Sequence, residues 1–187
     1  MSRVYARLFV IMGVSGSGKS LIGSDLARAL GVEFVEGDDY HPPSNVERMS
    51  RGIPLTDEDR QGWLRALASR LGDARDAGTG MVVACSALKQ SYRDILRTRA
   101  RDVRFVYLMG SQALLAERLA ERRGHFMPPS LLTSQFDTLE EPSPDEEAWV
   151  CDIREAPQDL IAALVARVAR DARASHTSPV PPIPPLK

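Results

Sequence analysis

Five stretches of mostly apolar residues recur along the chain, at 8–12, 32–36, 81–85, 103–108 and 148–153. Continuous apolar runs such as 81–85 are typical of strands that are buried on both faces of a parallel sheet. Between these runs, apolar residues return at helical spacing. This alternation predicts an α/β protein with five strands in a parallel sheet.

The helical patterns cover most of the remaining chain. They are expected over 21–30, 43–51, 54–77, 90–99, 112–123, 131–136 and 158–173. Within 54–77, four residues repeat at helical spacing and are predicted to be core residues rather than cofactor contacts: Trp63, Leu64, Leu67 and Leu71. Residues 1–174 are therefore predicted to form one domain. From Ser175 onward the composition becomes rich in proline, which favours extended and solvated backbone. We expect residues 175–187 to form a disordered tail.

A glycine-rich loop with the pattern G-x-x-x-x-G-K-[ST] follows the first apolar run and leads directly into a helical pattern. Its residues are Gly13, Val14, Ser15, Gly16, Ser17, Gly18, Lys19 and Ser20. An ordinary turn rich in Gly and Ser is the alternative, but strand, loop and helix in this order are the context of a phosphate-binding loop. Glycines let successive backbone N–H groups curl around an anion, and the helix N-terminus adds positive field. The loop predicts ATP as a ligand, with Lys19 at the β- and γ-phosphates and Ser20 on Mg²⁺.

Composition excludes some classes of function. The chain has 187 residues and a formal net charge of -1, so no broad surface for nucleic acid or membrane is expected. Its 2 cysteines form neither a metal-binding spacing nor a disulfide framework, which makes a cytoplasmic location the default. Arginine strongly outnumbers lysine, so the internal lysines, Lys19 and Lys89, are candidates for sites that need a compact charge.

Polar residues follow the second apolar run, where the carboxyl end of a parallel strand is predicted to face the ligand. Asp38 is the candidate for the γ-phosphate side and for a metal ligand, although a solvated turn or a helix cap is an alternative. The side chain of Asn45 is expected either to face inward, toward the site, or to lie on the protein surface with no role in the site. The third apolar run ends at Ser86, where many phosphate-loop enzymes carry an acidic Mg²⁺ ligand. Either Ser86 acts through water, or the metal depends on Ser20 and Asp38.

Cations gather in two further places. Arg60 stands early in a predicted helix, where a positive charge opposes the helix dipole. Arg93 follows Lys89 on the next helical pattern, and a solvated helix surface is the alternative for it. Near 118–130, three arginines and His125 flank a glycine and a Pro-Pro pair. These cations could simply complement a helix C-terminus. We favour a mobile lid in which Arg122, with Arg118, closes over the triphosphate and neutralises transition-state charge.

Taken together, these motifs resemble the gluconokinases of the small P-loop type, which are related in fold to shikimate and nucleoside monophosphate kinases. The matching stretches are the phosphate loop, Gly37-Asp38 with His41-Pro42, Cys85-Ser86-Ala87-Leu88-Lys89, Gly124-His125-Phe126 and Gln135-Phe136. The resemblance covers roughly residues 8–170 and leaves the proline-rich tail unmatched.

The resemblance implies a three-layer α/β/α P-loop NTPase fold, with the five-stranded parallel sheet between layers of helices, a mobile lid and often a homodimer. It also implies that the protein phosphorylates D-gluconate with ATP. It implies Lys19, Asp38 and Arg122 as catalytic residues, with Asp38 taking the proton of the acceptor alcohol. Gluconate carries a carboxylate and several hydroxyls, which call for cations and hydrogen-bonding groups. The expected substrate-binding residues are Asp38, His41, Asn45, Arg60, Lys89, Arg93, His125 and Gln135.

Two other functions fit part of the pattern. A shikimate-type or nucleotide kinase would share the loop, Asp38 and the lid while using a different acceptor. A nucleotide-dependent switch would need a D-x-x-G at a strand end and an N-K-x-D motif. Residues 59–62 match D-x-x-G, but within a predicted helix, and N-K-x-D is absent from the sequence.

Overall fold

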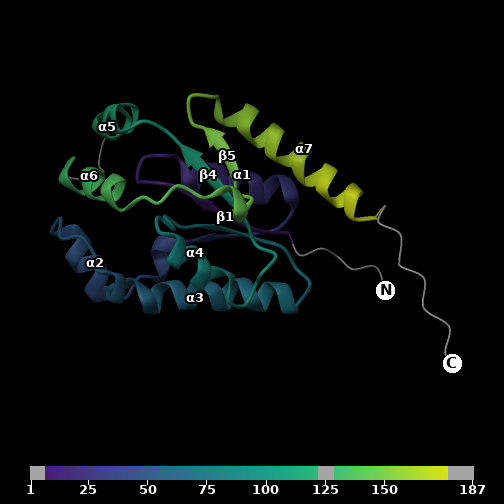
Figure 1. The fold of residues 1–187 in the computed structure, drawn as a ribbon, viewed down its shortest axis with the longest axis horizontal. Coiled ribbons are helices and arrows are strands. Elements are labelled where there is room, and N and C mark those ends of the chain that lie inside the picture. The colour runs from purple at the N-terminus through teal and green to yellow at the C-terminus, as the bar shows by residue number, and fades with distance from the viewer. Residues whose placement is uncertain (1–6, 122–128, 177–187) are drawn as a thin grey trace.

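The structure is a computed structural model that describes residues 7–121 and 129–176 (Figure 1). Its strands are β1 (Leu8–Met12), β2 (Glu33–Glu36), β3 (Met81–Ala84), β4 (Arg104–Met109) and β5 (Trp149–Asp152). Its helices are α1 (Lys19–Leu30), α2 (Pro43–Ser50), α3 (Asp57–Asp76), α4 (Gln90–Arg97), α5 (Gln112–Glu121), α6 (Pro129–Thr138) and α7 (Pro157–His176). Two short 3-10 turns, η1 (Gly37–Tyr40) and η2 (Pro144–Glu146), complete the elements.

The five strands form one parallel sheet in the order β2-β3-β1-β4-β5. Val10 at the centre of β1 is in register with Val83 of β3 and Phe105 of β4. Because all strands run the same way, the segments that follow β1, β2 and β3 meet at one edge of the sheet. The predicted sheet and its parallel direction are therefore confirmed.

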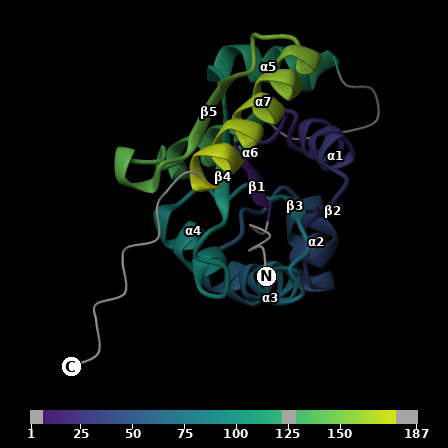
Figure 2. The same cartoon turned by 90° about the vertical axis from the view of Figure 1, so that its right-hand side faces the viewer.

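Helices cover both faces of the sheet, as Figures 1 and 2 show from two directions. Leu8, Val10 and Met12 of β1 pack with the buried residues of α3 and α4. Phe9 and Ile11 point the other way and pack with α1 and α7. Alternate residues of β1 thus pack in two cores, which explains why its apolar run is continuous.

Local signals in the sequence account for most helix boundaries. Helix α1 ends at Gly31, which adopts a left-handed conformation with φ 66°. Helix α3 begins at a capping box, in which Thr56 and Asp59 each bond the other's backbone N–H. The D-x-x-G match at 59–62 lies inside this helix rather than at a strand end. The switch interpretation therefore loses its only motif.

The C-terminal boundary differs from the expectation. Helix α7 continues to His176, so Ser175 and His176 are helical although they were predicted to open the tail. The first proline of that segment is Pro179, and a proline disfavours helical backbone only at itself and at the residue before it, so Ser175 and His176 can be helical. The other tail residues, and most of the expected lid at 118–130, lie outside the described residues. Within the described ranges, no helix is long and apolar enough to cross a bilayer.

Candidate active site

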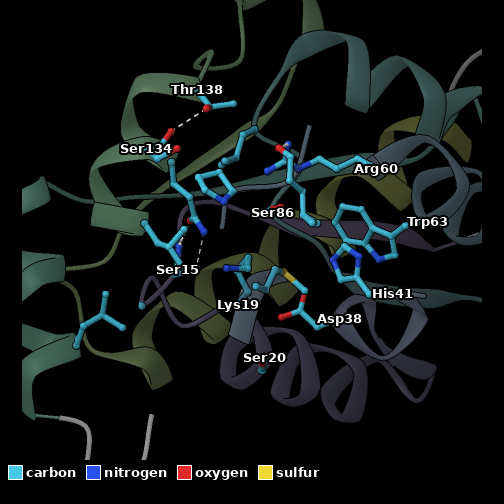
Figure 3. Close-up of a pocket in the computed structure, with 18 of the residues that line it drawn as sticks. Ser15, Lys19, Ser20, Asp38, His41, Arg60, Trp63, Ser86, Ser134 and Thr138 are labelled. Carbon is cyan, nitrogen blue, oxygen red and sulfur yellow. Dashed lines mark hydrogen bonds between the residues drawn. The ribbon is translucent and has the colours of Figure 1, made fainter. Parts of the chain in front are cut away.

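A cavity of about 530 Å³ lies where the segments after β1, β2 and β3 meet, and α6 contributes a further wall (Figure 3). It brings together nine of the residues expected in the site: Ser15, Gly16, Gly18, Lys19, Ser20, Asp38, His41, Arg60 and Gln135. In the close-up, Ser15 and Lys19 lie toward one side, and Arg60, Trp63 and His41 lie toward the other. The cavity therefore joins a phosphate-loop half to a half lined by other polar groups.

The phosphate loop has the backbone that its glycines predict. Gly13, Gly16 and Gly18 have φ of 142°, 82° and 94°, values that side chains with a Cβ rarely adopt. A Cβ at Gly13 would also lie 2.9 Å from the Leu108 carbonyl oxygen, so this residue has no room for a side chain. Gly18 caps α1, whose first residue is Lys19. The loop thus stands at a helix N-terminus, where backbone N–H groups favour an anion.

Gln135 connects α6 to the phosphate loop. Its Oε1 accepts from the Ser15 backbone N–H at 2.7 Å, and its Nε2 donates to Ser15 Oγ at 3.0 Å. The Lys19 ammonium donates to the Val14 carbonyl at 3.1 Å. Gln135 is expected to bind the sugar acid; in this structure its amide bonds to Ser15 of the phosphate loop and it also lines the cavity.

Asp38 projects from η1, the turn that follows β2, into the cavity. Gly37 fixes this turn against β3, since a Cβ there would lie 2.2 Å from the Ala84 carbonyl oxygen. Glu36, the last residue of β2, also lines the cavity and was not among the predicted site residues. Its position at a strand end, two residues before Asp38, is the signal that could have identified it.

His41 stacks on Trp63, with ring centroids 4.0 Å apart and an interplanar angle of 20°. Burial lowers the pKa of His41, nearby Asp38 opposes this effect, and Arg60 adds to it. The helical spacing of Trp63 predicted a core residue, and its side chain is buried, yet it also lines the cavity. Its place three residues after Arg60, on the same side of α3, was the available signal.

Arg60 lines the cavity at the start of α3. Its Nη1 donates to the Leu55 carbonyl oxygen and lies 3.5 Å from the Tyr92 hydroxyl. That hydroxyl donates to Asp57 Oδ1 at 2.5 Å, and Lys89 donates to both oxygens of Asp57 at 2.8 and 2.9 Å. Lys89 is thus engaged with Asp57 and is not part of the cavity lining.

Arg93, Asn45 and Arg118, which are also expected in the site, do not line the cavity. Arg93 is buried, pairs with Glu146 and donates to three backbone carbonyls, so its assignment to the substrate is corrected to a structural role. Asn45 is buried beside His41, and Arg118 donates to the Ile153 carbonyl at 2.6 Å. Arg122 and His125 lie outside the described residues.

The described residues suit a Mg²⁺ ion that is held partly by substrate phosphates and water, rather than a metal ion held by protein side chains alone. They contain no group of three or more His, Cys, Asp or Glu side chains that could hold a metal ion. Oxygen-bearing side chains do line the cavity, namely Ser20, Glu36 and Asp38. Mg²⁺ prefers oxygen and is usually bound by one or two side chains together with substrate phosphates and water. The donor set therefore fits.

Comparisons with known proteins agree with this geometry. The family model described as "AAA domain" matches residues 8–142. The chain is 50% identical to the thermosensitive gluconokinase of Escherichia coli K12 over 144 residues, 74% of each chain. It is 52% identical to the gluconokinase of Gluconobacter oxydans over 140 residues, covering 75% of this chain and 79% of that protein. A crystal structure of a gluconokinase from Sinorhizobium meliloti superposes with a TM-score of 0.83 at 46% identity, over 92% of this chain and 97% of the other. The chain therefore belongs to the gluconokinase family of P-loop kinases.

Proposed function

We propose that this protein transfers the γ-phosphate of ATP to the C6 hydroxyl of D-gluconate, giving ADP and 6-phospho-D-gluconate. The observation that carries the proposal is the single cavity in which Asp38 lies with Lys19 and Ser20 of the phosphate loop and with His41 and Arg60. Relatives named gluconokinase, which share 50% and 52% sequence identity with this chain, support D-gluconate as the acceptor.

On the nucleotide side, the loop amides, the N-terminus of α1 and the Lys19 ammonium would hold the phosphates of ATP. Ser20 would hold Mg²⁺, with Asp38 or Glu36 contributing directly or through water. When bound, Mg²⁺ supplies positive charge that neutralises the phosphate oxygens. The transition state of phosphoryl transfer is loose, so positioning and charge neutralisation should contribute more than proton removal.

On the acceptor side, Asp38 would orient the C6 hydroxyl and take its proton as the new P–O bond forms and the bond to the ADP oxygen breaks. Arg60 lines this half of the cavity, and its guanidinium group would bind the gluconate carboxylate. His41 would bind a hydroxyl. Arg122 and His125 are proposed to complete the site from the lid, with Arg118 near the nucleotide.

We further propose that the protein acts as a homodimer in the cytoplasm and binds neither nucleic acid nor membrane. A formal net charge of -1 supports the last two points, because neither partner would find a strong basic surface.

The test is ADP release measured with ATP and a panel of acceptors: gluconate, related sugar acids, shikimate and nucleoside monophosphates. Gluconate should give the highest kcat/KM. Asp38→Asn should lower kcat by about 10²–10⁴-fold, the usual share of general-base help, with the KM for ATP nearly unchanged. The neighbouring Asp39→Asn is the matched control, since Asp39 is exposed and is not among the lining residues. A preference for shikimate or a nucleotide, or normal turnover in Asp38→Asn, would refute the proposal.

A further inference from the structure

The imidazole of His41 has defined neighbours on two sides. Trp63 covers one ring face, and Asn45 faces the ring edge, with Asn45 Nδ2 3.5 Å from His41 Nδ1. Asn45 is 3% exposed, so its amide has little access to bulk water and depends on protein partners for its hydrogen bonds. The side that remains for His41 is the cavity, which its side chain lines in Figure 3.

The backbone of α3 determines which way the Asn45 amide points. Asn45 Nδ2 lies 2.8 Å from the Asp59 carbonyl oxygen. A carbonyl can only accept, so the amide atom that faces it must be the NH₂ group. The capping box of Thr56 and Asp59 holds this first turn of α3 in place. The amide orientation therefore follows from a fixed acceptor.

The amide in turn determines the tautomer of His41. The group that faces Nδ1 is the Asn45 NH₂, which donates and cannot accept. A proton on Nδ1 would set two donors against each other, whereas a bare Nδ1 accepts. In the neutral ring the remaining proton then sits on Nε2, because the partner of one ring nitrogen decides the state of the other.

Trp63 fixes the position of the same ring and of the turn beside it. Its indole Nε1 donates to the Gly37 carbonyl oxygen at 2.6 Å, and its ring stacks on His41. Gly37 directly precedes Asp38, and the His41 backbone N–H donates to the Asp38 carbonyl at 3.2 Å. One side chain of α3 thus holds both ends of the turn that carries the acceptor-side residues.

We propose that Asn45 and Trp63 are positioning residues that hold His41 as its Nε2–H tautomer, so that His41 donates a hydrogen bond from Nε2 to an oxygen of the sugar acid. This rests on the proposed function for the identity of the acceptor. It reassigns Asn45, which was expected to contact the substrate directly, to a role that acts through His41.

The first experiment reads the tautomer without any substrate. Protein carrying ¹⁵N-labelled histidine is studied by NMR at a pH well above the ordinary pKa of histidine, and the His41 signals are assigned by their absence in His41→Gln. The chain has 3 histidines, which keeps the spectrum simple. The expected result is a protonated Nε2 and a bare Nδ1. A proton on Nδ1 overturns the inference, whatever the enzyme phosphorylates.

The second experiment measures kinetics in variants. Asn45→Leu and Trp63→Phe should raise the KM for gluconate about five- to tenfold, the effect of losing one ordinary hydrogen bond, with the KM for ATP within about twofold. Asn45→Leu should also give a mixture of tautomers. Val46→Ala, at an exposed neighbour, and Trp149→Phe, at the other buried tryptophan, are the controls and should change neither parameter.

A third variant pair separates the tautomer from simple loss of a side chain. The amide nitrogen of Gln reaches the Nε2 position, and that of Asn reaches the Nδ1 position, so His41→Gln should retain a lower KM for gluconate than His41→Asn. If Asn45→Leu leaves the tautomer unchanged, or if His41→Asn is the better substitute, the inference fails while gluconate phosphorylation stands. If gluconate is not phosphorylated but Nε2 carries the proton, the proposed function alone fails.

Discussion

Replacing Arg93 tests whether an arginine that the sequence assigned to the substrate belongs to the core instead. Its Nε and Nη2 donate to the two oxygens of Glu146 at 2.6 and 2.7 Å, and the two side chains are 1% and 5% exposed. Its Nη1 donates to the carbonyls of Ala87, Leu88 and Glu140 at 3.1, 3.2 and 3.0 Å. Arg93→Met keeps much of the volume and removes every one of these hydrogen bonds.

The expected loss is large because the pair is buried. Removing one partner of a buried ion pair costs about 3–5 kcal/mol, since the other charge remains away from water. Arg97 Nη1 lies 3.2 Å from Glu146 Oε2 and would offset part of this cost, while three backbone carbonyls lose their donor and add to it. Domains have about 5–15 kcal/mol of stability in total. For a chain of 187 residues, Tm should fall by about 6–20 °C.

The assay is thermal and urea unfolding followed by far-UV circular dichroism, together with KM values measured well below the melting temperature. Arg93→Met should lose stability and keep its KM for gluconate within about twofold. Arg60→Met is the matched control with the opposite expectation: a KM for gluconate raised about tenfold or more, and stability changed by less than about 1 kcal/mol. If Arg93→Met kept its Tm and raised the KM for gluconate, Arg93 would contact the substrate and the reasoning would be wrong.

Two further predictions concern the turn before Asp38 and the response to acid. Gly37→Ala should lower the free energy of unfolding by about 1–3 kcal/mol and lower kcat, because its Cβ would collide with the Ala84 carbonyl. Gly62→Ala is the control: it has open space inside α3 and should raise the free energy of unfolding by up to about 1 kcal/mol. Equal melting temperatures for the two variants would contradict this prediction. Burial raises the pKa of Glu146, but Arg93 and Arg97 outweigh it and hold that pKa below the ordinary 4.5, so its stabilisation is complete above this value and is lost as pH falls below it. As pH falls, the free energy of unfolding should therefore decrease less steeply in Glu146→Gln than in the natural protein. An unchanged slope would show that Glu146 does not contribute to the pH dependence of stability.

The sequence predicted the elements of the fold well because their causes are local. Apolar runs, the glycine at the end of α1 and the Thr56–Asp59 capping box are all visible within a few residues. The same holds for the phosphate loop, where pattern and neighbouring elements agree. Ser175 was assigned to the tail because the composition changes there, but a change in composition alone does not end a helix.

Long-range partners explain what the sequence could not predict. Arg93 and Lys89 have the charge for a sugar-acid site, but Glu146 stands 53 residues from Arg93 and Asp57 stands 32 residues from Lys89. No local pattern reveals such pairs. Trp63 was judged by its helical spacing, which reports burial, and burial does not separate a core residue from one that also forms the wall of a site.

The strand order fixes how far apart the two substrates can lie. The phosphate loop follows β1, the turn with Asp38 follows β2, and β3 alone separates them. Adjacent strands are about 4.7–4.9 Å apart, so the two segments begin roughly 10 Å from each other. Under the proposed function, the alcohol would be held by β2, α2 and α3, while the nucleotide would be held by β1 and α1. On this basis, substitutions in β2, α2 and α3 should change which alcohol accepts the phosphoryl group while the affinity for ATP stays the same.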